Sequence, residues 1–149
     1  MKIAEVLHRK GTTVATIRAA DTIEAAIRKL VELNLGALLV IDRWSKIVGV
    51  LSERDVVFAV SRFGTRALSF QVDAVMNHDV TSCTSEDRVD KVMGLMTVHR
   101  VRHLPVIDRG HLSGIVSIGD LVKNYLLEKE QEASVLRDMK AAQGLAETG

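Results

Sequence analysis

The chain has 149 residues, a formal net charge of +1, 47% hydrophobic residues and 26% charged residues. These values allow one compact domain or two small halves that share a core, and they exclude extensive intrinsic disorder. A charge so close to zero gives no global basic field for duplex nucleic acid, so any anion must be bound locally.

The sequence contains neither a membrane span nor a secretion signal that we can recognise. Its longest purely apolar run, Ala37 to Ile41, is far too short to cross a bilayer, and the opening MKIAEVLHRKG lacks an apolar signal stretch. Cys83 is the single cysteine, which excludes an intrachain disulfide and favours a buried structural thiol. We therefore expect a cytoplasmic protein.

In chain order, the first predicted elements are a short lead-in helix and an amphipathic helix, and both occur twice. The lead-in segments read AEVLHRK and VDAVMNH. At an offset of 66 residues, the segment from Val14 to Arg43 aligns with that from Val80 to Arg109. The apolar positions of the second helix match at spacing i, i+3, i+4 and i+7, and each helix follows acidic and hydroxyl residues suited to capping. The matched positions are Ile23, Ala26, Ile27 and Leu30 in one copy, and Val89, Val92, Met93 and Met96 in the other.

Each copy continues with a predicted β-hairpin and a second helix. The runs GALLVID and RHLPVID are followed by short turns and then by IVGVLS and LSGIVS, and a helix begins at Ser52 or Ser117. We thus predict an α/β fold of two β-α-β-β-α repeats with pseudo-twofold symmetry, the two sheets packing on each other through their helices. The predicted boundaries are 1–62 and 63–127 for the repeats and 128–149 for a helical tail.

The motif Ser-x-x-Asp opens the last helix of each repeat, as SERD and SIGD. Its simplest role is a capping box, in which serine and aspartate satisfy the backbone at the helix start. A helix N-terminus at a cleft also offers N–H groups to a phosphate, and a nearby carboxylate suits a ribose diol. Repetition of the whole strand-Ser-x-x-Asp-helix context favours binding in addition to capping.

From about residue 1 to residue 127 the chain resembles the cystathionine-β-synthase-type (CBS) domain pair of stand-alone bacterial two-CBS proteins. The resemblance rests on VATIRAADTIEAAIRKLVELNLGALLVIDRWSKIVGVLSERDV and VTSCTSEDRVDKVMGLMTVHRVRHLPVIDRGHLSGIVSIGDLV. It implies a homodimeric regulatory module that binds an adenine nucleotide such as AMP, ATP or NAD between the repeats, needs no metal and acts on an effector protein in trans.

The resemblance also implies the binding residues. Asp55 and Asp120 would hold ribose hydroxyls, and Ser52 and Ser117 would lie near the phosphate. The residues implied beside the base are Thr13, Val14, Thr16, Gly36, Ala37 and Leu38 in the first repeat, and Val80, Thr81, Ser82, Arg102, His103, Leu104 and Pro105 in the second.

The two predicted clefts differ in charge. The second repeat has HRVRH where the first has LNLGA, and we expect Arg102 and His103 either to complement the helix dipole or to grip a phosphate beside Asp120. Arg54, replaced by Gly119 in the second repeat, could reach a ligand phosphate in either cleft.

Other functions have weaker support in the sequence. His99 and His103 have a metal-ligand spacing only if both are helical, and we find no third ligand. Motifs of hydrolases and nucleotide-cleaving enzymes are missing, so we expect a binding module and no enzyme. The alternative is a ligand-free scaffold or a stress-response protein associated with nucleic acid.

Overall fold

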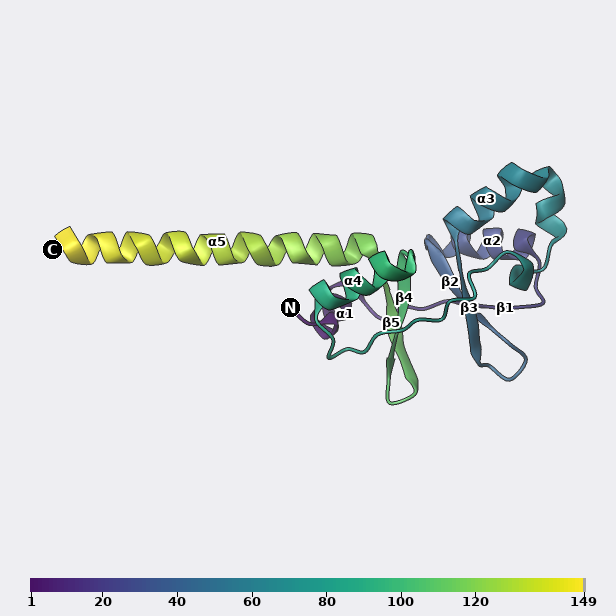
Figure 1. Ribbon diagram of the computed structural model, residues 1–149, viewed down its shortest axis with the longest axis horizontal. Helices are drawn as coiled ribbons and strands as arrows, with labels where there is room; N and C mark the ends of the chain where they lie inside the picture. Colours follow the sequence, from purple (N-terminus) through teal and green to yellow (C-terminus); the bar gives the residue numbers. More distant parts are fainter. Residues whose placement is uncertain (149) are drawn as a thin grey trace.

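The two repeats form two separate sheets, and a long helix leads away from the second (Figure 1). The computed structural model describes the backbone of residues 1–148 and the side chains of residues 1–144. Its helices and strands, in chain order, are α1 (Ile3–Lys10), β1 (Thr16–Arg18), α2 (Ile23–Leu33), β2 (Ala37–Ile41), β3 (Ile47–Ser52), α3 (Glu53–Phe63), η1 (Gly64–Ser69), η2 (Val72–Ala74), α4 (Val89–His99), β4 (His103–Asp108), β5 (His111–Ser117) and α5 (Ile118–Thr148).

In the first repeat β1 runs parallel to β2, and β2 pairs antiparallel with β3. The second repeat has the same hairpin in β4 and β5, but its first strand is reduced to a single parallel bridge between Cys83 and Val106. Cys83 is buried there, and burial raises the pKa of its thiol to about 12. This confirms the expected buried structural cysteine.

The starts of α2 and α4 differ, although the sequence predicts acidic or hydroxyl caps for both. Thr22 caps α2 by accepting a hydrogen bond from the amide of Ala25. At α4 the N-cap is Arg88, whose side chain makes no capping bond. In both helices the first amide donates to a backbone carbonyl, that of Val89 to Met1 and that of Ile23 to Phe70. The N-terminal segment therefore satisfies the backbone at the start of α4.

The core of each repeat is completed by the lead-in segment of the other. Ile3, Val6 and Leu7 of α1 are buried against residues of the second repeat, whereas Val72 and Met76 are buried in the core of the first. In the chain, α1 precedes the first repeat, and the segment with Val72 and Met76 precedes the second repeat. The exchange ties the two halves together, since neither half has its full core without the other.

The contact between the sheets is made by strand residues, so the expectation that the halves pack through their helices was wrong. Ala37 and Leu39 of β2 lie with Val50 of β3 and Ile115 of β5 in a third buried cluster. Side chains alternate along β2, so Leu38 and Val40 point the other way, into the core of the first repeat. One face of each sheet is thus free to form the boundary between the halves.

The carboxylate of Asp108 joins the loop before α4 to the second hairpin. It accepts hydrogen bonds from the hydroxyl of Ser113, at 2.6 Å, and from the hydroxyl and the amide of Ser85. These bonds, with Ser113 the largest contributor, lower the pKa of Asp108. A carboxyl whose pKa is lower in the folded state stabilises the fold above its unfolded pKa of about 4, and the contribution disappears as pH falls through the folded value.

We therefore expect Asp108→Asn to reduce the loss of stability that acid causes. The urea midpoint of the original protein should fall between pH 5 and pH 3, and the midpoint of Asp108→Asn should fall less, since this variant has no carboxyl to protonate at the site. Asp138→Asn, on the exposed part of α5, is the control and should keep the original pH dependence. Identical pH profiles for Asp108→Asn and the original protein would contradict this role.

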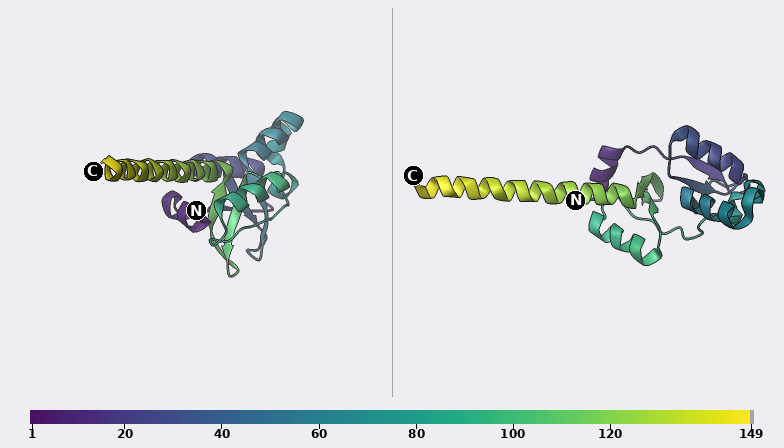
Figure 2. Two further views of the ribbon diagram at one scale, coloured as in Figure 1. Left: turned by 60° about the vertical axis from the view of Figure 1, so that its left-hand side comes forward. Right: turned by 90° about the horizontal axis from the view of Figure 1, so that it is seen from above.

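Helix α5 packs on the second repeat only over its first turns. Leu121 and Asn124 are buried, whereas Val135, Leu136 and Met139 are more than half exposed. Both views of Figure 2 show the helix projecting beyond the rest of the molecule. Among the described residues, none of the helices combines the length and hydropathy needed to cross a bilayer. Gly149, at the end of the predicted tail, lies outside the described residues.

Candidate functional site

A cavity of about 1520 Å³ opens between the start of α3 and the end of α4, and it draws on both repeats. This volume is more than a single drug-sized ligand needs. We call residues 64–88, which link α3 to α4, the connector. Polar and charged groups from α3, the connector and the end of α4 line the cavity, together with apolar side chains from α3 and the connector. The lining residues are Gly36, Val50, Ser52, Glu53, Arg54, Asp55, Val57, Phe58, Ala59, Arg62, Phe63, Phe70, Ala74, Val75, Asn77, Asp79, Met96, Thr97, Arg100, Val101, Arg102 and His103.

At the start of α3, Ser52 and Asp55 form the capping box that their spacing predicts. The amide and the hydroxyl of Ser52 each donate to Oδ2 of Asp55 at 2.9 Å, and the amide of Asp55 donates to the serine hydroxyl at 3.3 Å. The other carboxylate oxygen, Oδ1, accepts no hydrogen bond from the residues that the structure describes. Capping therefore leaves Asp55 able to accept a hydrogen bond from a ligand hydroxyl.

Four arginines line the cavity together with the carboxylates of Glu53, Asp55 and Asp79. Arg54 and Arg62 come from α3, Arg102 precedes β4, and Arg100 is the C-cap of α4 in a left-handed conformation with φ of 54°. Guanidinium groups at this density suit a phosphate or a pyrophosphate, which they can bind bidentately. The four arginines come from both repeats.

Part of the cavity lining is apolar and aromatic, and the guanidinium of Arg62 lies 5.7 Å from the centroid of the Phe63 ring. Phe63 and Phe70 contact each other edge to face, with ring centroids 5.2 Å apart. Val57 and Phe58 of α3, which also line the cavity, are each 66% exposed, so this part of the lining is open to solvent. A wall of this kind can receive the face of a planar base.

Of the two histidines at the end of α4 and the start of β4, His103 lines the cavity and His99 contacts the lining residue Asp79. Nδ1 of His99 lies 2.9 Å from Oδ2 of Asp79, and the amide and hydroxyl of Thr81 donate to Oδ1 of the same carboxylate. These bonds, with that from the Thr81 hydroxyl the largest, lower the pKa of Asp79. His103 lies against Gly36, and its pKa is lowered by burial and then by the charge of Lys10. The described residues contain no group of three His, Cys, Asp or Glu side chains placed to hold a metal.

The second Ser-x-x-Asp motif lies at the start of α5 and has a different environment. The amide of Ser117 donates to Oδ2 of Asp120 at 2.9 Å, and Nζ of Lys10 lies 2.5 Å from the same oxygen. Burial alone would raise the pKa of Asp120, but the hydrogen bonds from Lys10 and Ser117 outweigh it and the net pKa is lowered. Asp120 does not line the large cavity.

The structure thus brings together part of the predicted set. Gly36, Ser52, Arg54, Asp55, Arg102 and His103 line one cavity, so Arg102 and His103 lie in the cleft of Asp55, although the sequence groups them with Asp120. Leu38 and Leu104 are fully buried in the two repeat cores, where their side chains cannot face a ligand. The other predicted residues outside the cavity lining are Thr13, Val14, Thr16, Ala37, Val80, Thr81, Ser82, Pro105, Ser117 and Asp120.

Several cavity residues are not predicted from the sequence. Arg100 lies at the end of α4 and Asp79 in the segment before it, and they share the cavity with residues of the first repeat that are distant in the chain. Phe58 and Arg62 lie on α3 one turn and two turns after the motif, so helical spacing from Asp55 is the signal that could have identified them.

Comparison with known proteins agrees with this architecture. A family model described as CBS domain matches residues 3–62 and 72–127. The Bacillus subtilis CBS domain-containing protein YhcV is 30% identical over 92% of this chain and 96% of its own length. A crystal structure of a CBS-domain protein from Agrobacterium tumefaciens has 37% identity and a TM-score of 0.77, covering 82% of this chain and 91% of that one.

A more distant match, at 20% identity and a TM-score of 0.74, is the CBS domain pair of protein MJ0100, solved with 5'-methylthioadenosine and S-adenosyl-L-methionine; it covers 86% of this chain and 98% of that one. That likeness shows the shared fold. The two repeats with their hairpins, the paired Ser-x-x-Asp motifs and the family match over most of the chain lead to one conclusion: the chain belongs to the CBS-domain family as a tandem CBS pair.

Proposed function

We propose that this CBS pair is a regulatory module, and no enzyme, that binds an adenine nucleotide of the AMP, ATP or NAD type in the cleft between its repeats. The observation that carries the proposal is the cavity in which Asp55, with one carboxylate oxygen unused, lies among four arginines and an aromatic wall. Ribose hydroxyls, phosphate and base each find a chemically suited group there. MJ0100, with its two adenosyl ligands, is a precedent within the same fold.

Binding would act by favouring one placement of the two repeats. The cavity takes groups from both halves, so a ligand that contacts both has an affinity that depends on their relative position. Binding would require no metal. The conformational change would be transmitted in trans, to a separate effector protein. We propose a cytoplasmic homodimer, with the exposed Val57 and Phe58 of α3 as part of the contact surface.

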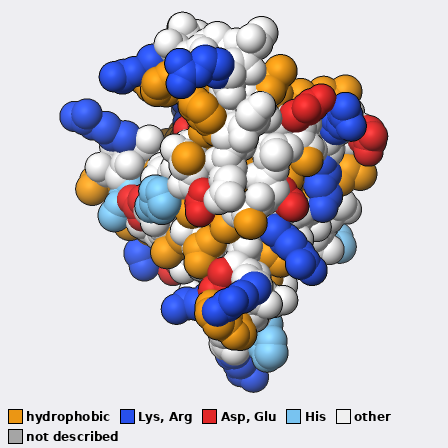
Figure 3. All heavy atoms as spheres, turned by 90° about the vertical axis from the view of Figure 1, so that its right-hand side faces the viewer, with side chains coloured by type: hydrophobic (Ala, Val, Ile, Leu, Met, Phe, Trp, Pro, Cys, Tyr) orange, Lys and Arg blue, Asp and Glu red, His pale blue; other side chains and the backbone are white. Residues whose placement is uncertain are grey.

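The alternative is a ligand-free scaffold or a nucleic-acid-associated stress protein. On the end of the molecule that the first repeat forms, basic side chains are interspersed with acidic and hydrophobic ones (Figure 3). This face offers no continuous basic surface for a nucleic-acid backbone, which favours a local ligand site.

The test is a calorimetric titration of nucleotide-stripped protein with AMP, ATP, NAD and S-adenosylmethionine. At least one should bind saturably. Asp55→Ala should weaken binding in the large cavity about tenfold to a hundredfold, the contribution expected of hydrogen bonds to a charged group. Asp120→Ala should weaken only the binding of a second molecule at the start of α5. Asp138→Ala, on the projecting part of α5, is the control and should bind as the original protein does.

Failure of all four ligands to bind would reject the proposal and favour the scaffold. Nucleic-acid affinity that falls steeply with salt would instead identify the stress-protein alternative. Both Asp55 and Asp120 cap helices, so thermal unfolding of each variant must show that it is folded before its affinity is interpreted.

A further inference from the structure

Lys10, the last residue of α1, lies beside Asp120 at the start of α5, where the sequence predicts the second ligand cleft. Its Nζ is 2.5 Å from Oδ2 of Asp120 and 2.9 Å from the carbonyl oxygen of Ile115. Both charged side chains are about 30% exposed, at 31% for Lys10 and 27% for Asp120. The second cleft therefore contains a fixed counter-ion for the carboxylate that the sequence predicts for ribose.

In the sequence alignment of the two repeats, an acidic residue of the first cleft matches Lys10. Leu7 packs under Gly114 and Met76 packs under Gly49, and these glycines are equivalent in the repeat, so Leu7 corresponds to Met76. Three residues further along the chain, Lys10 aligns with Asp79, which lines the large cavity. Helix α1 continues to Lys10 whereas Asp79 lies outside the helices, so the two residues match in sequence and not in conformation.

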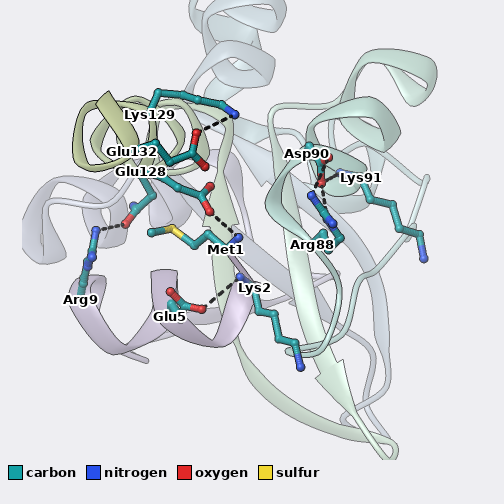
Figure 4. Close-up of polar contacts among 11 residues, drawn as sticks. Met1, Lys2, Glu5, Arg9, Arg88, Asp90, Lys91, Glu128, Lys129 and Glu132 are labelled. Atoms are coloured by element: carbon teal, nitrogen blue, oxygen red, sulfur yellow. Dashed lines mark hydrogen bonds and ion pairs between the residues drawn. The ribbon is translucent and has the colours of Figure 1, made fainter. Parts of the chain in front are cut away.

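Helix α1, which carries Lys10, is held firmly against α5 (Figure 4). Arg9 donates to Oδ1 of the buried Asn124 at 3.2 Å, and the amide nitrogen of Asn124 donates to the backbone carbonyl of Asp120. The amino group of Met1 also pairs with Glu128 at 2.9 Å. These contacts place Lys10 next to Asp120 as part of the fold and not as a free surface side chain.

We propose that Lys10 makes the Asp120 cleft selective for phosphorylated ligands. A ribose whose hydroxyls donate to Asp120 competes with Lys10 for the carboxylate. A ligand with a phosphate offers the displaced ammonium a new anion, whereas a neutral nucleoside leaves it with the Ile115 carbonyl oxygen but no anionic partner in a half-buried site. The inference rests on the proposed nucleotide binding and assigns its specificity in this cleft to one residue.

The experiment compares AMP with adenosine by calorimetry in an Asp55→Ala background, which isolates the second cleft. With Lys10 present, AMP should bind at least about tenfold more tightly than adenosine, as expected for one charge-assisted contact. Lys10→Met should bring the two affinities to within about threefold of each other, and Lys10→Arg should keep the preference. Lys91→Met is the matched control, because Lys91 also pairs with an aspartate, Asp87, but on the exposed side of α4.

Each other outcome decides against the inference. An AMP preference that survives Lys10→Met, or equal affinities with Lys10 present, would overturn it while nucleotide binding stands. Binding that is lost with Asp55→Ala alone would show that the second cleft stays closed, which also overturns it. If AMP fails to bind even the original chain, the proposed function itself is rejected together with this inference.

Discussion

Ile3→Ala is expected to lower the free energy of unfolding by about 2–5 kcal/mol, the range for truncating a fully buried isoleucine. Ile3 has no exposed surface and lies in the core of the second repeat, together with Val92, Leu104 and Leu121. The substitution would leave a cavity among side chains that belong to the far end of the chain. Urea unfolding measures the loss.

Hydrogen exchange should also show where the protection is lost. Amides of α4 and β4 should exchange faster in Ile3→Ala, and those of β2 and β3 should change less, because the missing side chain supports the second core. Val31→Ala, at a position 74% exposed on α2, is the control and should change stability by less than about 0.5 kcal/mol. Faster exchange confined to residues 16–52 would contradict the exchanged packing of α1.

Gly49→Ala is expected to destabilise the protein by about 1–3 kcal/mol, and more than Gly114→Ala at the equivalent position. A Cβ on Gly49 would come within 2.5 Å of the Met76 sulfur and 2.8 Å of the backbone oxygen of Asn77. A Cβ on Gly114 would meet only the side chain of Leu7, at 2.8 Å, among its nearest atoms. A side chain can rotate away, whereas a backbone carbonyl moves only with its segment.

The same substitution should affect the cavity. Asn77 exchanges two backbone hydrogen bonds with Val50, and both residues line the cavity. Pushing this segment outward would shift Asp79 and weaken nucleotide binding in Gly49→Ala, while Gly114→Ala should retain binding at the Asp55 cleft. Urea midpoints of the two variants give the stability ranking, and equal or reversed losses would show that the Asn77 segment yields easily.

Much of this fold could be predicted because the same pattern of apolar and capping residues occurs twice in the chain. The periodicity of Ile23, Ala26 and Leu30 and of Val89, Val92 and Met96 predicts buried helix faces, and all six residues are buried. The structure ends both helices in the same way, with Asn34 and Arg100 in the left-handed conformation at φ of 51° and 54°. Asparagine is one of the residues that favour this conformation, so Asn34 carries a local signal for its cap, whereas Arg100 carries none.

The exchange of lead-in segments could not be predicted, because an amphipathic pattern indicates that a helix has a buried face but does not say which core receives it. The set of residues that line the cavity could not be predicted from the sequence for a similar reason, since it depends on how the two repeats pack. Arg100 and Arg102 lie near Asp55 only through the packing of one repeat on the other. Lys10 appears in the sequence as one more basic residue at a helix end, and its place beside Asp120 depends on contacts between α1 and α5.

The projecting part of α5 gives the molecule a lever. Asp120 belongs to the first turn of this helix, and from there to Thr148 the helix extends about 40 Å at 1.5 Å per residue. A rotation of about 10° at the cleft would displace its far end by about 7 Å. Asp120 and Lys10 pair at the base of this helix, so a rotation of α5 that accompanies a change in their pairing would produce its largest displacement at the far end of the helix.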